Sequence, residues 1–258
     1  MTTSLITGAT SGIGAAFARR LGADRHGLVL VARDERRLAA TAADLRQRYG
    51  VEVEVLPADL TEDDGIAAVE ARLRDRARPV DVLVNNAGAG NRGTFLDVPV
   101  ADELRMLRLH CEAVLRLTAA AVGAMRERRY GFVVNVASVA AFMPRGTYGA
   151  SKAWVVRFTE GVAAEAAGSG VRLLALCPGF VRTEFHARAG MDAGRLPAVA
   201  WLDADAVVTA CLRDLALRRT VSVPSVRYKL AVALARHLPT RVYGAASTRA
   251  GRRFDPNL

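Results

Sequence analysis

Short apolar runs alternate with longer amphipathic stretches through the first two-thirds of this chain, and this rhythm constrains the fold more than any other feature. The runs are rich in Val, Leu and Ile, and each ends in a polar or Gly-rich turn. They cover residues 4–7, 27–32, 51–56, 80–85, 131–138 and 171–177, and a further run covers 220–224. Strands that alternate with helices imply right-handed crossovers and a parallel sheet covered by helices on both faces. The pattern predicts an α/β fold with a doubly wound parallel sheet.

The chain has 258 residues, which is enough for one large domain of this class, and we find no linker that would divide residues 1–258. Helical spacing covers 15–25, 34–50, 62–77, 101–129, 150–170 and 203–219. The rhythm breaks after Pro178. Residues 183–202 predict a long loop of the kind in which a substrate lid often sits, and residues 225–258 predict a basic helical extension.

Charge and composition exclude several classes of protein. The net charge is +10, but residues 225–258 carry seven basic residues against one Asp, so +6 lies there and +4 in the rest. Since no nucleic-acid motif accompanies this charge, we do not expect a nucleic-acid partner. Three separated Cys indicate reduced thiols in a cytoplasmic protein, and no Cys/His spacing suits a metal. No apolar run reaches the ~20 residues of a membrane span, and the N-terminus has no secretory pattern.

The first apolar run ends in the Gly-rich stretch TGATSGIG, and a helical pattern follows directly. Gly8 suits the tight exit from a strand, Gly12 lets the backbone approach a pyrophosphate, and Gly14 allows close packing of helix on strand. Free N–H groups at the helix start attract phosphate. An ordinary strand-to-helix turn also contains glycine, but this position in a βαβ pattern favours a dinucleotide site.

The end of the second run discriminates between nicotinamide cofactors. An NAD site needs an acidic side chain there for the ribose hydroxyls. This chain has Ala32 at that place and Arg33 after it, and a guanidinium pairs with a 2′-phosphate. Asp34 comes one step later, where it suits a helix cap. Although Arg33 also fits a solvated loop in an Arg-rich chain, we favour NADP(H).

Two further motifs fall at the predicted carboxyl edge of the sheet. Asp59 follows the third run, where it either accepts a hydrogen bond from adenine or forms a turn before Thr61. The sequence NNAG, residues 85–88, follows the fourth run. Its amide side chains can hydrogen-bond neighbouring strands together, and Gly88 allows the backbone to lie close to a cofactor. A simple Asn-Gly turn would explain the same residues.

Tyr148 and Lys152 are four residues apart on a predicted helix and therefore share a face, and Ser138 ends the preceding strand. A Tyr hydroxyl with a pKa near ~10 is a reluctant proton donor, and a nearby ammonium lowers that pKa. Ser138 suits a hydrogen bond to a substrate oxygen. Only two of the chain's 36 basic residues are Lys, so a Lys at this spacing is not an effect of composition. The set suits proton transfer at a C–O group while hydride moves at carbon.

TGATSGIG, NNAG, Ser138, YGASK and PGFVRT together resemble the classical short-chain dehydrogenases/reductases, from about Ser4 to Thr183. The resemblance implies a Rossmann-type fold with seven strands and NAD(P)-dependent oxidation or reduction of an alcohol/carbonyl pair. It makes Tyr148 the acid/base, while Ser138 orients the substrate and Lys152 holds the nicotinamide ribose. The residues it places at the cofactor are Gly8, Thr10, Ser11, Gly12, Ile13, Gly14, Arg33, Asp59, Leu60, Asn86, Ala87, Gly88, Tyr148, Lys152, Pro178, Gly179, Val181 and Thr183.

The chain departs from this family in two places. His110 stands where many members have an Asn that holds a water in a proton relay. It is either a tolerated polar replacement, a proton relay in its own right, or a sign of impaired activity. Ser138 and Tyr148 are only ten positions apart, about three fewer than is usual in the family, so the loop between them is short. Pro144 and Gly146 suit the tighter turn.

The substrate and the assembly are less constrained. Phe142, Phe185, Met191 and Trp201 suggest a substrate with an apolar group, and helices at 101–129 and 148–168 resemble the family's usual dimer surface, so we expect a homodimer or homotetramer. Val226, Leu230, Leu234 and Leu238 recur every four residues. Such a basic amphipathic stripe packs on protein more often than on a membrane. A cofactor-binding scaffold or sensor, and an epimerase or dehydratase on the same fold, stay open as alternatives.

Overall fold

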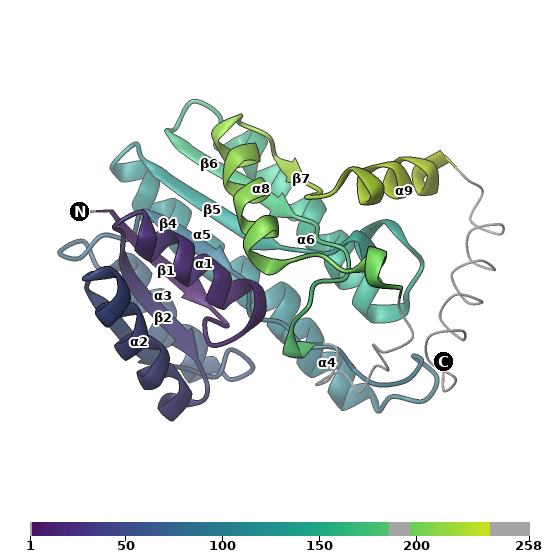
Figure 1. Ribbon diagram of the computed structural model, residues 1–258, viewed down its shortest axis with the longest axis horizontal. Coiled ribbons are helices and arrows are strands. Elements are labelled where there is room, and N and C mark those ends of the chain that lie inside the picture. The colour runs from purple at the N-terminus through teal and green to yellow at the C-terminus, as the bar shows by residue number, and fades with distance from the viewer. Residues whose placement is uncertain (1, 186–196, 238–258) are drawn as a thin grey trace.

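The computed structural model describes residues 2–185 and 197–237, and it contains one parallel sheet of seven strands. The strands are β1 (Thr3–Thr7), β2 (Gly27–Ala32), β3 (Val53–Pro57), β4 (Val82–Asn85), β5 (Gly131–Val136), β6 (Val171–Leu176) and β7 (Val221–Ser222). Their order across the sheet is β3-β2-β1-β4-β5-β6-β7 (Figure 1). The predicted Rossmann-type doubly wound fold is confirmed, and each predicted apolar run overlaps one strand.

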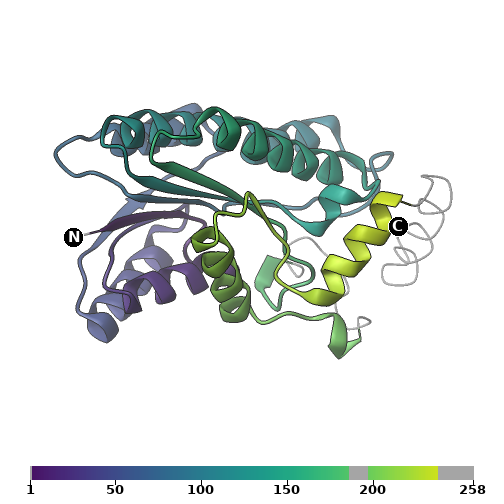
Figure 2. The same ribbon diagram turned by 90° about the horizontal axis from the view of Figure 1, so that it is seen from above.

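Helices cover both faces of this sheet, as Figure 2 shows from above. One layer holds α1 (Gly12–Ala23), α2 (Glu35–Tyr49) and α8 (Ala204–Ala216), and the other holds α3 (Asp63–Arg74), α5 (Ala113–Glu127) and α6 (Gly146–Glu165). Alternate side chains of each strand enter opposite layers. On β1, Ile6 packs with the first layer and Leu5 with the second, and both are fully buried. This double burial explains why the strands are continuous apolar runs.

The stretch 101–129, which we predicted as continuously helical, divides into three elements. α4 (Val100–Leu107) leads into a π-helical turn (Arg108–Glu112), and α5 follows it. The Ala113 N–H donates to the Arg108 carbonyl, five residues back, so the turn holds one residue more than an α-helical turn. π turns of this kind are often found at functional sites. Here the turn carries His110, whose side chain is fully buried.

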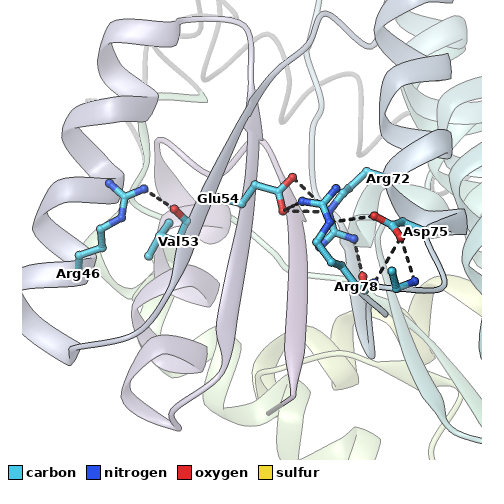
Figure 3. Close-up of polar contacts among 7 residues, drawn as sticks. Arg46, Val53, Glu54, Arg72, Asp75 and Arg78 are labelled. Carbon is cyan, nitrogen blue, oxygen red and sulfur yellow. Dashed lines mark hydrogen bonds and ion pairs between the residues drawn. The ribbon is translucent and has the colours of Figure 1, made fainter.

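The outer edge of the sheet at β3 is covered by arginines (Figure 3). Arg46, on α2, donates to the carbonyl of Val53. The buried Arg72 pairs with Glu54 at 2.9 Å, and Arg78 reaches the same carboxylate at 3.3 Å. An exposed strand edge can pair with another chain, and charged side chains on it oppose that pairing. Part of the large Arg content therefore protects the sheet edge.

The C-terminal part of the described chain is α9 (Val226–His237), which follows β7. Its apolar stripe is 62–71% exposed at Val226, Leu230 and Leu234, so this face does not pack on the described core, and Leu238 lies outside the described residues. The helix is anchored by Val232, which is 6% exposed. In the part of the chain that the structure describes, no helix has the length and apolarity to cross a membrane.

Candidate active site

The predicted site residues converge at the carboxyl edge of the sheet, where β1 and β4 lie side by side and the strand order reverses. On one side of this junction the strand after β1 is β2, and on the other side the strand after β4 is β5. Such a switch point is where open α/β sheets bind ligands. The Gly-rich turn follows β1, Asn86 follows β4, Ser138 follows β5, and Pro178 follows β6. The fold thus brings together motifs from four strands.

The Gly-rich turn has a backbone conformation and close contacts that require glycine. Gly12 has a φ of +55°, and a Cβ on it would lie 2.8 Å from Thr183 Cγ2. A Cβ on Gly14 would lie 2.2 Å from the carbonyl oxygen of Gly8, which leaves no room for any side chain. Ser11 is the N-cap of α1, and its side chain does not cap the helix. The N-terminal N–H groups of α1 are thus left to donate to an anion, and a dinucleotide phosphate fits this cradle. Thr10 lies in the turn and Ile13 in the first turn of α1.

The amides of NNAG tie the strands together, as we predicted. The Asn86 side chain donates to the Thr7 carbonyl at 2.9 Å, and its backbone N–H donates to the Thr7 hydroxyl at 2.9 Å. The Asn85 side chain donates at 2.9 Å to Asn135 on β5, whose own amide donates to Thr159 on α6. Asn85 and Asn135 are buried and Asn86 is partly buried, and all three have partners, so they fix the sheet edge and the turn of Ala87 and Gly88.

Arg33 and Asp59 lie together at the far end of this edge. Arg33 Nη1 is 3.8 Å from Asp59 Oδ2, and the Arg33 side chain is 72% exposed. The other oxygen of Asp59 accepts from the backbone and hydroxyl of Thr61 at 2.9 and 2.8 Å, so Asp59 forms the predicted turn, and its contact with adenine stays a prediction. Leu60, beside it, is buried. Asp34 caps α2 by accepting from the Arg37 N–H at 3.0 Å, as predicted.

Ser138 and Tyr148 face each other across the short loop. Ser138 is the N-cap of a 3₁₀ turn (Val139–Phe142), and its hydroxyl accepts from the Ala140 N–H at 3.1 Å. Gly146, with a φ of +49°, starts α6 only two residues before Tyr148, which is the tight turn we expected of this glycine. Burial raises the pKa of Tyr148, and a side-chain hydrogen bond with Ser138 opposes this rise. Tyr148 is thus a protonated donor at neutral pH.

Lys152 is 6% exposed and lies one helical turn beyond Tyr148. Its ammonium donates to the Val136 carbonyl at 3.2 Å and lies 5.9 Å from the centre of the Tyr148 ring. Burial lowers the pKa of Lys152 to about 8. We expected Lys152 to lower the pKa of Tyr148, but burial outweighs every nearby charge and raises it.

His110 uses both of its ring nitrogens. Nε2 lies 3.2 Å from the Ala89 N–H and accepts from it, and Nδ1 lies 3.0 Å from the Ser151 hydroxyl. That hydroxyl in turn donates to the Tyr148 carbonyl at 2.8 Å. Burial, and secondly the charge of Lys152, hold the pKa of His110 well below its ordinary value. The imidazole is therefore neutral.

The segment after β6 contacts the turn that follows Ser138, and α9 packs on it. The Pro178 carbonyl accepts from the Val139 N–H at 3.0 Å, and Val181 forms a bridge with Leu202. A Cβ on Gly179 would lie 2.1 Å from the ring of Tyr228, so this ring of α9 packs directly on the turn. Within the predicted lid, 183–202, residues 186–196 lie outside the described residues.

Of the aromatic residues proposed for the substrate, Phe185 lies 6.2 Å from Tyr148 between ring centres. Trp201 packs edge-on against Phe180. Phe142 instead lines an open cavity of about 520 Å³ between α6, β7 and α9. Met191 lies outside the described residues.

Sequence reasoning did not single out Thr7, Ser151 or the ion pair of Arg37 with Glu184. Thr7 ends the first apolar run and Ser151 directly precedes Lys152, so the position of each residue in the sequence could have indicated its place in the site. The ion pair joins residues 147 positions apart, so no local pattern indicates it. Among the described residues, no three His, Cys, Asp or Glu side chains gather as metal ligands.

Comparisons with known proteins agree with this geometry. The family model described as short chain dehydrogenase matches residues 2–193. A Streptomyces coelicolor protein named "Putative ketoacyl reductase" is 39% identical over 191 residues, which cover 71% of this chain and 72% of that protein. A short-chain dehydrogenase from Sphingobium yanoikuyae in complex with NADPH is 39% identical, with a TM-score of 0.83 over 99% of this chain and 96% of that one. A short chain dehydrogenase/reductase from Burkholderia phymatum in complex with NAD is 29% identical, with a TM-score of 0.79 over 90% and 92%.

Proposed function

This chain belongs to the short-chain dehydrogenase family, and from that premise we propose that it transfers hydride between NADP(H) and an alcohol/carbonyl substrate, with Tyr148 as the acid/base. The observation that carries the proposal is the meeting of Ser138, Tyr148 and Lys152 at the same edge of the sheet as the Gly-rich turn. A protein that only bound the cofactor would have no need of a proton donor there.

The nicotinamide, when bound, supplies or accepts the hydride. In reduction, the protonated Tyr148 hydroxyl donates its proton to the substrate oxygen as negative charge develops there. The Ser138 hydroxyl, hydrogen-bonded to Tyr148, holds that oxygen within reach of the proton. Lys152 has three N–H donors and gives one to Val136, so two are left for the nicotinamide ribose. Gly8, Gly12 and the start of α1 hold the pyrophosphate.

The preference for NADP(H) over NAD(H) rests on Arg33. Its guanidinium is exposed, lies near Asp59 at the adenosine end, and follows Ala32 at the place where NAD sites have an acid. Known relatives hold either cofactor, since one is solved with NADPH and another with NAD. Arg33→Ala should therefore weaken NADPH binding more than NADH binding. Equal losses for the two cofactors, measured by fluorescence titration, would rule out the preference.

The substrate that fits best is a small carbonyl compound with an apolar group. Phe185 packs near Tyr148, and a relative's name describes it as acting on ketoacyl groups. The scaffold or sensor alternative rested on His110, and it loses support because the Ser138, Tyr148 and Lys152 set is assembled. An epimerase or dehydratase uses similar groups, so the test must follow net consumption of the cofactor.

The test is NADPH consumption against a panel of ketones, aldehydes and β-ketoacyl thioesters. We expect Tyr148→Phe to lower kcat by about 10²–10⁴-fold and leave NADPH affinity nearly unchanged. The matched control is Tyr130→Phe, because the Tyr130 ring is half-exposed and lies outside the site. Equal activity of wild type and Tyr148→Phe would show that Tyr148 is not the acid. Tight NADPH binding without turnover of any carbonyl would favour the sensor.

A further inference from the structure

The fully buried His110 joins two parts of the active site that are distant in the sequence. One ring nitrogen accepts from Ala89, in the turn after β4, and the other contacts Ser151 on α6. A Cβ on Gly88 would lie 3.3 Å from Nε2, so the imidazole also packs closely against that turn. The ring centre lies 5.6 Å from that of Tyr148, with the two rings edge to face.

The hydrogen-bond directions along this chain are fixed by its two ends. The Ala89 N–H can only donate, so Nε2 must present its lone pair. The Tyr148 carbonyl can only accept, so the Ser151 hydroxyl must donate to it. The Ser151 oxygen then accepts from Nδ1–H. Only the neutral imidazole with its proton on Nδ1 satisfies all three bonds.

We propose that His110 is a positioning residue, which through Ser151 holds the Tyr148 turn of α6 at a fixed distance from the cofactor-binding turn after β4. The π-helical turn supports this role, because it follows α4, precedes α5 and carries the buried His110. A proton relay has less support, because both ring nitrogens are already bonded to structural partners. The inference rests on the proposed function, in which Tyr148 is the acid/base, and deepens it.

Paired substitutions separate this role from its alternatives. Asn places its amide N–H near the position of Nδ1, so His110→Asn keeps the bond to Ser151. Gln places its carbonyl near Nε2, so His110→Gln keeps only the bond to Ala89. We expect kcat to fall about tenfold or more in His110→Gln and Ser151→Ala, because small displacements of a reacting group cost this much, with NADPH affinity nearly unchanged. His110→Asn should stay within about threefold of wild type, and the His110→Gln/Ser151→Ala double variant should be no worse than the poorer single variant.

The control is His26→Asn, since His26 makes a similar 2.7 Å bond to the buried Ser4 but lies in the turn before β2, away from the site. It should leave kcat unchanged. Unchanged kcat in folded Ser151→Ala and His110→Gln would overturn the proposal. Equal losses in both His110 variants, with Ser151→Ala fully active and one pKa missing from their pH–rate profiles, would show a relay instead.

A measurement on the wild-type protein covers the case in which the variants do not fold. Nitrogen NMR of the imidazoles, with His110 assigned by difference, should show a neutral ring protonated on Nδ1 at neutral pH. An imidazolium, or a ring protonated on Nε2, would overturn the proposal. This result does not depend on turnover, so failure of the proposed function and failure of the positioning role can be told apart.

Discussion

Lys152 shows how one residue combines a structural and a chemical demand. It is a buried residue of α6 whose ammonium donates to the last residue of β5, and the same burial lowers its pKa to about 8. An arginine has a planar fork and stays charged, so it would not titrate in this range. The sequence already indicated this position, because Lys is so rare in the chain. It indicated a lowered pKa for Tyr148, whereas the net direction is upward because it depends on burial by residues far apart in the sequence.

Because the pKa of Lys152 lies near neutrality, NADPH binding should depend on pH. Below about 8 the ammonium is charged and attracts the anionic cofactor, and above that value the charge is lost as pH rises. The Kd for NADPH should therefore increase between about pH 7 and about pH 9, with proton uptake on binding at the higher value. Titration calorimetry in buffers of different ionisation enthalpy measures both. Lys152→Arg should lose this dependence, and an identical pH dependence in both proteins would contradict the assignment.

Gly14 should tolerate no side chain. Its Cβ would lie 2.2 Å from a backbone oxygen, so Gly14→Ala should lower the free energy of unfolding by about 1–3 kcal/mol and weaken NADPH binding. Gly161, inside α6, has no atom within 4 Å of its Cβ position, so Gly161→Ala should stabilise by about 0.5–1 kcal/mol. Urea unfolding compares the two variants. Equal effects would mean that close packing at the turn is not what Gly14 provides.

At the level of elements, the sequence predicted the strands and the two helical layers because their periodicity is local and strong. It did not predict the π-helical turn, because inserting one residue leaves the apolar spacing of 101–129 readable as one helix. Nor did it predict how α9 packs, because the stripe that looks apolar in sequence is exposed while Tyr228 and Val232 make the contacts. Such packing depends on partners distant in the chain.

α9 should support the nicotinamide end of the site through Tyr228. Its hydroxyl accepts from the Phe180 N–H at 3.2 Å and donates to the Ala200 carbonyl at 2.7 Å. Tyr228→Phe removes both bonds and keeps the ring on Gly179, so we expect a loss of about 1–2 kcal/mol in the free energy of unfolding and a higher KM for the carbonyl substrate. Unchanged stability and KM would show that solvent replaces both bonds. Urea unfolding and steady-state kinetics measure the two effects.

For the whole molecule, we predict that copies of the chain assemble through exposed apolar side chains of α4 and α5. α4 exposes Val100 and Leu104, at 68% and 60%, and α5 exposes Leu115 at 44%. We expect this surface to join copies of the chain. Leu104→Glu should then shift the mass measured by light scattering toward the monomer, whereas Leu217→Glu, at the end of α8, should not. A wild-type protein that is monomeric at micromolar concentration would contradict this expectation.

The fate of the nicotinamide hydride tests the proposed chemistry most directly. With NADPH carrying deuterium at its transferable position, the wild-type protein should place that deuterium on the carbinol carbon of the product alcohol. Tyr148→Phe, at equal cofactor occupancy, should transfer it at least about 10²-fold more slowly. Product that forms without deuterium, or deuterium transfer that is as fast in Tyr148→Phe as in wild type, would contradict hydride transfer with Tyr148 as the acid.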